Sequence, residues 1–183
     1  SLPNMIVVSP VDSLEARKAT IAMARLPKPC YIRLSREKIP VVTTLQTPFE
    51  IGRAEVFYEG KDVAIIATGQ MVYRALLVAK EMETNKISVR VINCHTIKPL
   101  DKQVILKAAE ECGAIVTAEE HQVMGGMGSA VAEVLAQDCP VPMRFIGIQD
   151  KFGQSGKPAE LIEYYNLGVH AIKQAVKELL SKK

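Results

Sequence analysis

Short apolar runs that alternate with stretches of helical periodicity constrain the fold more than any other feature of this sequence. Residues 5–8, 63–67, 89–92 and 114–117 are such runs, rich in Val, Ile and Ala. Apolar residues without polar alternation are typical of strands that are covered on both faces of a parallel sheet. Helical spacing, as over residues 71–82, fills the gaps between the runs. This alternation predicts the α/β class.

The chain divides into two regions. A strand at residues 5–8, a helix that Asp12 or Ser13 can cap, and a strand at residues 30–34 predict a leading βαβ unit. The polar, proline-punctuated stretch that follows predicts a linker. The expected divisions are part of a domain over residues 1–42, a linker over 43–49 and a second domain over 50–183.

The second region predicts a three-layer α/β/α sandwich around a mostly parallel, mixed sheet. Residues 54–58 and 63–67 both resemble strands and flank a Gly-Lys turn, so they predict an antiparallel pair. Two closing helices are expected to begin near Pro158 and Gly168. Because two buried strands alone are marginal, we expect the leading βαβ unit to stay ordered only by packing on the second region or on a second copy.

Composition excludes several classes of protein. The chain has 23 Lys and Arg against 20 Asp and Glu, without a basic cluster, so no nucleic-acid partner is expected. No apolar run approaches the roughly 18 residues of a membrane span, so no membrane partner is expected either. The four cysteines form no CxxC pair, which fits reduced thiols. Since the first residues do not resemble a signal peptide, we expect a cytoplasmic protein.

Arg36 is a candidate site residue because it follows a predicted strand. Open parallel sheets bind ligands at the carboxyl ends of their strands. A guanidinium at that place could bind a phosphate through two parallel hydrogen bonds. The plainer interpretation is a solvated arginine paired with Glu37, and position alone favours it.

Residues 119–128, Glu-Glu-His-Gln-Val-Met-Gly-Gly-Met-Gly, link a strand to a helix. The helix-start amides could bind an anion, and the two acids with His121 could suggest metal binding or acid–base work. However, the spacing fits neither a dinucleotide motif nor a P-loop, and adjacent side chains of a strand end point to opposite faces. The pattern favours a tight packing turn. We therefore predict no metal ligand and no catalytic residue in this chain.

The remaining conspicuous residues favour structural interpretations. Residues 68–70 resemble the start of a helix, and residues 154–158 contain a serine without the spacing of a nucleophile elbow. His95 is a lone histidine at a strand end, and His170 lies on a surface-type helix. Taken alone, these residues indicate an α/β domain with conspicuous turns.

Several stretches, in order along nearly the whole chain, resemble the C-terminal third of transketolases. They are residues 3–12, 31–36, 96–101, 119–128 and 152–161. The Ile-Lys-Pro-Leu-Asp and Ser-Gly-Lys-Pro strings are fairly specific together. The resemblance implies that the leading region is the end of a pyrimidine-binding domain. The rest resembles the C-terminal domain shared by transketolases, deoxyxylulose-phosphate synthases and beta subunits of 2-oxo-acid dehydrogenases.

Transketolases of the pentose phosphate pathway use thiamine diphosphate and magnesium to transfer a two-carbon ketol unit from a ketose phosphate to an aldose phosphate. The resemblance implies that Arg36, the arginine of the Leu-Ser-Arg motif, binds the terminal phosphate of the sugar. The Gly-Asp-Gly stretch and downstream asparagine that hold magnesium and diphosphate in this family do not occur in the chain. The resemblance therefore implies that the chain alone binds no cofactor and is inactive, and that the complete enzyme is a homodimer.

Two alternatives remain open at this point. The chain could be a beta-subunit portion of a 2-oxo-acid dehydrogenase, which pyruvate decarboxylation by the parent protein would reveal. It could also be a non-catalytic assembly module that uses the glycine-rich turn as a contact surface.

Overall fold

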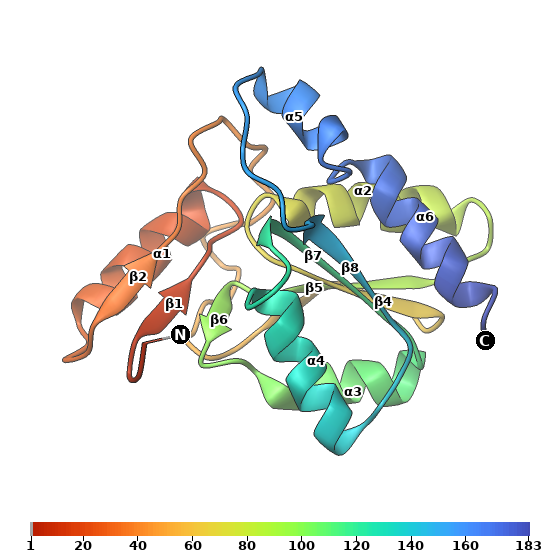
Figure 1. Ribbon diagram of the computed structural model, residues 1–183. Helices are drawn as coiled ribbons and strands as arrows, with labels where there is room; N and C mark the ends of the chain where they lie inside the picture. The colour runs from red at the N-terminus through yellow and green to blue at the C-terminus, as the bar shows by residue number, and fades with distance from the viewer. Residues whose placement is uncertain (1) are drawn as a thin grey trace.

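The computed structural model describes residues 2–183, which form two β-sheets with helices packed around them (Figure 1). The strands are β1 (Ile6–Val8), β2 (Cys30–Ile32), β3 (Glu55–Tyr58), β4 (Val63–Ala67), β5 (Val89–Asn93), β6 (Thr96–Lys98), β7 (Ile115–Gln122) and β8 (Met143–Ile148). The helices are α1 (Ser13–Ala24), α2 (Met71–Glu83), α3 (Lys102–Cys112), α4 (Met127–Asp138), α5 (Pro158–Tyr164) and α6 (Val169–Leu180). The α/β class is confirmed, and β6 is a strand that the sequence did not predict.

The larger sheet of the described chain has the strand order β3-β5-β4-β7-β8. Strand β4 pairs in parallel with β5 and β7, and β7 pairs in parallel with β8. Strand β3 lies antiparallel to β5 at the edge. Helices α2 and α6 cover one face of this sheet, and α3 and α4 cover the other (Figure 1). The predicted three-layer α/β/α sandwich with a mixed sheet is therefore confirmed.

The predicted antiparallel pairing of β3 with β4 is wrong, because β5 lies between them. The turn that joins β3 to β4 crosses the start of β5, where the amides of Lys61 and Asp62 donate to the Ser88 carbonyl oxygen at 3.1 and 2.8 Å. A Cβ atom at Gly60 would lie 2.2 Å from the carbonyl carbon of Val89. Glycine at this position lets the turn pass close enough for β5 to fit between the two strands.

Residues 2–49 form a smaller βαβ arrangement, here called the N-terminal unit, and residues 50–183 are called the C-terminal unit. Strands β1 and β2 are parallel, and α1 forms the crossover between them, as predicted. Helix α1 is capped by Asp12, whose carboxylate accepts a hydrogen bond from the Glu15 amide at 2.9 Å. Strand β2 ends at Ile32 rather than at Leu34.

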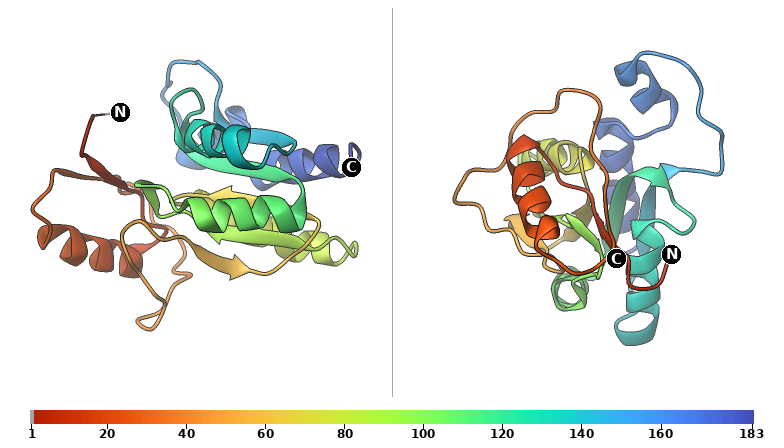
Figure 2. Two further views of the ribbon diagram at one scale, coloured as in Figure 1. Left: turned by 90° about the horizontal axis from the view of Figure 1, so that it is seen from below. Right: turned by 90° about the vertical axis from the view of Figure 1, so that its left-hand side faces the viewer.

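Strand β6 connects the two units. Its residues belong to the C-terminal unit, but it pairs antiparallel with β1, so the smaller sheet has the order β2-β1-β6. The N-terminal unit lies at one end of the molecule, and α1 lies apart from the helices that cover the larger sheet (Figure 2). A strand of the C-terminal unit therefore completes the sheet of the N-terminal unit.

Candidate functional site

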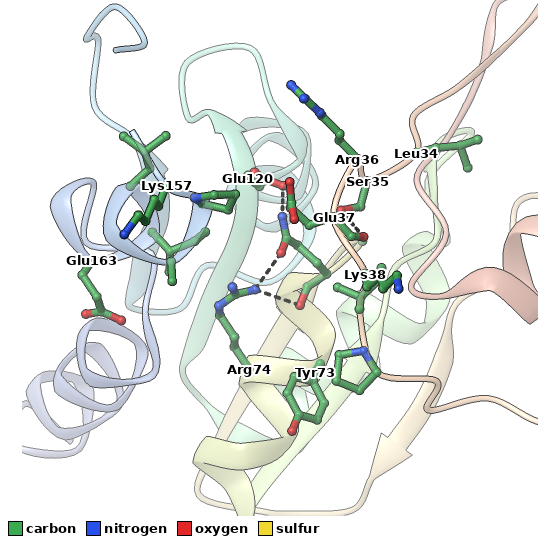
Figure 3. Close-up of a pocket in the computed structure, with 18 of the residues that line it drawn as sticks. Leu34, Ser35, Arg36, Glu37, Lys38, Tyr73, Arg74, Glu120, Lys157 and Glu163 are labelled. Carbon is green, nitrogen blue, oxygen red and sulfur yellow. Dashed lines mark hydrogen bonds between the residues drawn. The ribbon is translucent and has the colours of Figure 1, made fainter. Parts of the chain in front are cut away.

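A groove of about 1240 Å³ lies between the two units, beyond the carboxyl ends of β2 and β4 (Figure 3). Its walls include the segment that carries Arg36, residues 33–40, and two turns that were conspicuous in the sequence, residues 68–70 and 154–158. These three segments are far apart in the sequence, and the fold brings them together. Because open α/β sheets bind ligands beyond the carboxyl ends of their strands, this groove is the candidate functional site.

Arg36 lies on the wall of this groove that comes from the N-terminal unit (Figure 3). Its side chain is exposed, and the hydrogen bonds and ion pairs of residues 2–183 do not include its guanidinium. Glu37 also lines the groove but forms no ion pair with Arg36. The arrangement leaves the donors of Arg36 available to an anion. Its role as a phosphate ligand stays a prediction.

A second guanidinium, that of Arg74, lies in the groove on α2, at a position that no sequence motif singles out. Its Nη1 donates to the side-chain oxygen of Gln70 at 3.1 Å and to the Gln70 carbonyl oxygen at 3.4 Å. The amide nitrogen of Gln70 in turn donates to the carboxylate of Glu120 (Figure 3). Burial lowers the pKa of Arg74, and the nearby carboxylates of Glu120 and Glu163 oppose that shift. Gln70, the residue before α2, and Glu120 of β7 thus hold one guanidinium in a fixed position.

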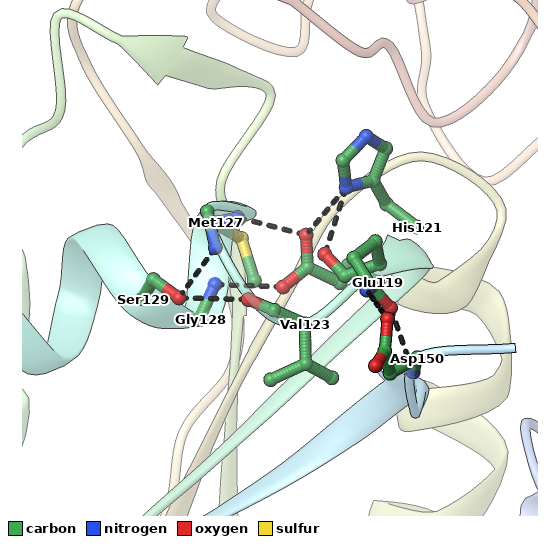
Figure 4. Close-up of polar contacts among 9 residues, drawn as sticks. Glu119, His121, Val123, Met127, Gly128, Ser129 and Asp150 are labelled. Atoms are coloured by element: carbon green, nitrogen blue, oxygen red, sulfur yellow. Dashed lines mark hydrogen bonds and ion pairs between the residues drawn. The ribbon is translucent and has the colours of Figure 1, made fainter. Parts of the chain in front are cut away.

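The glycine-rich turn closes around a buried carboxylate of the protein itself (Figure 4). Glu119 accepts hydrogen bonds from the amides of Met127 at 2.7 Å and Gly128 at 2.8 Å, at the start of α4. Burial raises the pKa of Glu119, and the bonds from Gly128 and Met127 oppose this. A Cβ atom at Gly126 would lie 2.3 Å from Glu119 Oε2. Because Glu119 occupies the helix start, the packing interpretation of this turn fits better than an external anion site.

Buried polar groups connect parts of the N-terminal unit next to the groove. Asp12 accepts hydrogen bonds from the amides of Val42 at 2.8 Å and Thr43 at 2.7 Å, and from the Thr43 hydroxyl at 2.8 Å. Burial alone would raise the pKa of Asp12, but the hydrogen bonds from Glu15, Thr43 and Val42 hold it below its ordinary value. Asp12 thereby fixes the segment after β2 against the start of α1.

Glu15 crosses the boundary between the units. Its carboxylate accepts a hydrogen bond from the Val11 amide at 2.6 Å and one from the side-chain amide of Asn93, on β5, at 2.7 Å. The Asn93 side-chain oxygen is buried and has no hydrogen-bond partner in the described chain. Burial raises the pKa of Glu15 to about 7, against the hydrogen bonds from Val11 and Asn93. This contact couples the protonation of one unit to the packing of the other.

His95 is a structural residue at the same boundary. It is fully buried and stacks on Phe49 with a centroid separation of 4.4 Å. Its Nδ1 lies 3.0 Å from the Thr96 hydroxyl, and its Nε2 has no partner among the described residues. Burial lowers the pKa of His95 to about 4, so the imidazole is neutral at ordinary pH. The interpretation of His95 as a histidine without a partner triad fits this geometry.

The other two histidines are exposed. His170 lies at the start of α6 and lines the groove. His121 lies beside a second hollow of about 440 Å³, and its Nδ1 is 3.9 Å from Glu119 Oε2 (Figure 4). Within residues 2–183, no group of three or more His, Cys, Asp or Glu side chains is placed to hold a metal ion. In the same part of the chain, no helix is long and apolar enough to cross a bilayer.

Comparison with known proteins gives one consistent family. Residues 52–172 match the family described as transketolase, C-terminal domain. The whole chain is 41% identical to the 6-deoxy-6-sulfo-D-fructose transketolase subunit of Clostridium sp. (strain MSTE9) and covers 57% of that protein. It is 36% identical over its whole length to an apulose-4-phosphate transketolase subunit of Phocaeicola vulgatus, of which it covers 58%. The chain thus spans little more than half of these relatives.

Two solved structures resemble the chain. A protein described as "Split gene transketolase, inactive beta4 tetramer" superposes with a TM-score of 0.95 and 43% identity, over 98% of this chain and 59% of the other. The transketolase of Campylobacter jejuni superposes with a TM-score of 0.74 and 20% identity, over 96% of this chain and 26% of the other. The second likeness concerns the fold alone.

Proposed function

The chain belongs to the transketolase family, as the C-terminal portion of a transketolase, and from this premise we propose a function for the complete protein. The complete protein transfers a two-carbon ketol unit from a ketose phosphate to an aldose phosphate. The observation that carries the proposal is the free guanidinium of Arg36, which lies in the family's Leu-Ser-Arg motif and lines the groove.

In this proposal Arg36 binds the terminal phosphate of the sugar. An arginine can donate two parallel hydrogen bonds to a phosphate, and this fixes the distance between the phosphate and the reacting end of the sugar. The exposure of Arg36 and its lack of a partner among residues 2–183 support this role. Arg36 is a binding residue in this scheme and takes no part in bond breaking.

Thiamine diphosphate and magnesium supply the carbanion chemistry of the complete enzyme in this proposal. The residues of this chain do not fit the magnesium diphosphate group. Its buried carboxylates Asp12, Glu15, Asp101 and Glu119 all accept hydrogen bonds from backbone amides or from Asn93. We therefore propose that other parts of the protein hold the cofactor and that residues 1–183 alone are inactive.

We further propose that the complete enzyme is a cytoplasmic homodimer of the pentose phosphate type. The four cysteines of the chain are free thiols, which supports a reducing compartment. The relatives named above are transketolases, so a 2-oxo-acid dehydrogenase is not favoured. A non-catalytic assembly module is not favoured either, because these relatives are subunits of transketolases.

The test is ketol transfer by the complete protein with Arg36→Gln. Loss of charged hydrogen bonds to phosphate should raise KM for a phosphorylated acceptor about 10- to 100-fold. KM for the same acceptor without its phosphate should not change. Arg17→Gln removes an exposed arginine of α1 that does not line the groove, and is the matched control. Equal KM values for Arg36→Gln and Arg17→Gln would contradict the assignment, and turnover of sugars by residues 1–183 alone would contradict the proposed inactivity.

A further inference from the structure

Arg74 has one edge of its guanidinium that the protein does not use. Both of its hydrogen bonds within residues 2–183 come from Nη1, so Nε and Nη2 donate none there. The ion pairs of the described residues, taken to 4.0 Å, do not include Arg74. Arg74 is therefore a half-buried cation whose neighbouring carboxylates, Glu120 and Glu163, lie beyond ion-pair distance, and perturbed charged groups of this kind are concentrated at functional sites. The Nε–Nη2 edge is the geometry that binds an oxyanion through two parallel hydrogen bonds.

The used edge of Arg74 is held in place by two neighbouring side chains. Glu120 binds the amide nitrogen of Gln70, and this fixes which way the Gln70 oxygen points (Figure 3). That oxygen accepts from Arg74 Nη1 at 3.1 Å, so the plane of the guanidinium is set by a chain of contacts from β7. A donor fork that is oriented before the ligand arrives loses less entropy on binding.

The positive charges around Arg74 favour an anionic ligand. Lys157 also lines the groove, from the turn before α5, and like Arg74 it belongs to the C-terminal unit, whereas Arg36 extends from the wall of the N-terminal unit (Figure 3). Lys157 is exposed and its ion pair with Glu160, at 3.8 Å, is a surface pair of little strength, so its ammonium can turn to a ligand. Glu120 and Glu163 also line the groove near Arg74 and would repel an anion, which limits the affinity.

We propose that Arg74 is the centre of a second oxyanion site in the groove, which binds the phosphate group of a phosphorylated small molecule. Two phosphate oxygens accept from Nε and Nη2 of Arg74, and a third is left for Lys157. A carboxylate carries a single negative charge, whereas a phosphate carries up to two and has more acceptor oxygens, so Arg74 and Lys157 together should bind a phosphate more tightly. The site consists of residues of the C-terminal unit, so it goes beyond ketol transfer and does not depend on the role proposed for Arg36.

The experiment is a titration of the chain with inorganic phosphate, followed by NMR of the arginine Nε–H groups. Arg74→Lys has no Nε–H group and so assigns the Arg74 signal. That signal should move saturably with phosphate, in the original protein and equally in Arg36→Gln. Arg74→Gln should weaken phosphate binding by about tenfold or more, since it removes two charged hydrogen bonds. Lys80→Gln, which removes an exposed charge of the same helix outside the groove, should not change it.

Two further arms sharpen the test. Glu163→Gln should tighten phosphate binding about threefold, because it removes a like charge near the site. Acetate should bind more weakly than phosphate. A phosphate response that does not saturate, or equal losses of phosphate affinity in Arg74→Gln and Lys80→Gln, would overturn the proposal. Acetate binding as tight as phosphate binding would also overturn it, and so would loss of the Arg74 response in Arg36→Gln. If Arg74→Gln unfolds, Arg74→Lys, which keeps the charge and loses the fork, provides the same comparison.

Discussion

The two units of this molecule bury their strands in different ways. The C-terminal unit covers both faces of its sheet with apolar side chains from four helices, and residues such as Ile65 and Ile66 are fully buried on opposite faces. The core of the N-terminal unit consists of only four buried side chains within the described residues: Ile6, Val8, Ala19 and Met23. The other buried groups of this unit include the polar residues Asp12, Glu15 and Thr43.

This difference indicates which unit depends on the other. Burial of apolar area stabilises at about 25 cal/mol per Å², so the larger core stabilises the C-terminal unit by itself. The N-terminal unit packs Val11 and Val42 into the core of its neighbour. It also relies on directional contacts with that neighbour: the pairing of β1 with β6, the Glu15–Asn93 hydrogen bond and the bond from the Ser9 amide to the His95 carbonyl oxygen. We expect it to open locally before the whole chain unfolds.

The largest expected effect comes from the core of the C-terminal unit. Ile92→Ala, at a fully buried position of β5, should lower the free energy of unfolding by about 4 kcal/mol. Ile6→Ala, in β1, should cost about 2 kcal/mol and act mainly on its own unit, because its core is smaller and less closed. Denaturant unfolding gives the two totals, and amide hydrogen exchange shows where protection is lost. Loss of protection across the C-terminal unit in Ile6→Ala would show that the units unfold together.

The next effect concerns pH and the boundary between the units. Glu15 has a pKa of about 7 in the fold against an ordinary value of 4.5, so between these values the folded protein holds a proton that the unfolded chain has lost. Stability should therefore fall by about 3 kcal/mol as pH rises through that window. His95 has a pKa of about 4 in the fold against an ordinary value of 6.5, so between these values the unfolded chain holds a proton that the folded protein lacks. Its contribution to stability therefore rises by a similar amount as pH rises through this window.

Because the two slopes oppose each other, the original protein should change little in stability between about pH 4.5 and 6.5. Glu15→Gln should uncover a rising slope, and His95→Gln should uncover a falling one. Glu15→Gln carries no charge at pH 8, where burial of the ionised Glu15 carboxylate costs stability, so this variant should be more stable than the original protein at that pH. Unfolding by denaturant over this pH range measures the slopes. Identical pH profiles for all three proteins would show that the boundary does not bind protons in this way.

The smallest effect compares two helix caps, one in each unit. Asp12→Asn should cost about 2 kcal/mol, because the Asp12 carboxylate accepts hydrogen bonds from three backbone amides and a hydroxyl. Asp101→Asn should cost about 1 kcal/mol, since Asp101 accepts from the amides of Ala54 and Val104 and can keep one of them. Thermal unfolding measures both values. A larger loss of stability in Asp101→Asn than in Asp12→Asn would contradict the expectation that the N-terminal unit depends more on polar contacts than the C-terminal unit does.

Much of the fold could be predicted because the signals are local. The apolar runs that form β4, β5 and β7, and the helical periodicity of α2, are properties of residues that are close in the sequence. These strands and this helix could therefore be predicted. The pairing of β3 was predicted wrongly because its partner, β5, is contributed by residues beyond the next strand. The short strand β6 was missed since its pairing with β1 has no periodic signal of its own.

The candidate site was predictable to a smaller extent. Arg36 could be singled out because it follows a strand and lies in a recognisable motif, and the structure places it in the groove. Arg74 could not, since in the sequence it is one polar residue of an amphipathic helix. The candidate role of Arg74 depends on its contact with Gln70 and on the contact of Gln70 with Glu120, which lies 50 residues beyond Gln70, in β7. No short sequence window contains all three residues.

The sequence by itself determined the layers of this protein, the order of its helices and most of its strands, and its membership of a family, because each depends on residues that are adjacent or in a fixed motif. Only the tertiary structure decided which strand lies beside which, which charges are buried and which guanidinium is left free. Those properties depend on pairs such as Glu15 and Asn93, 78 residues apart, and the free energy of such a contact exists only once the chain has folded.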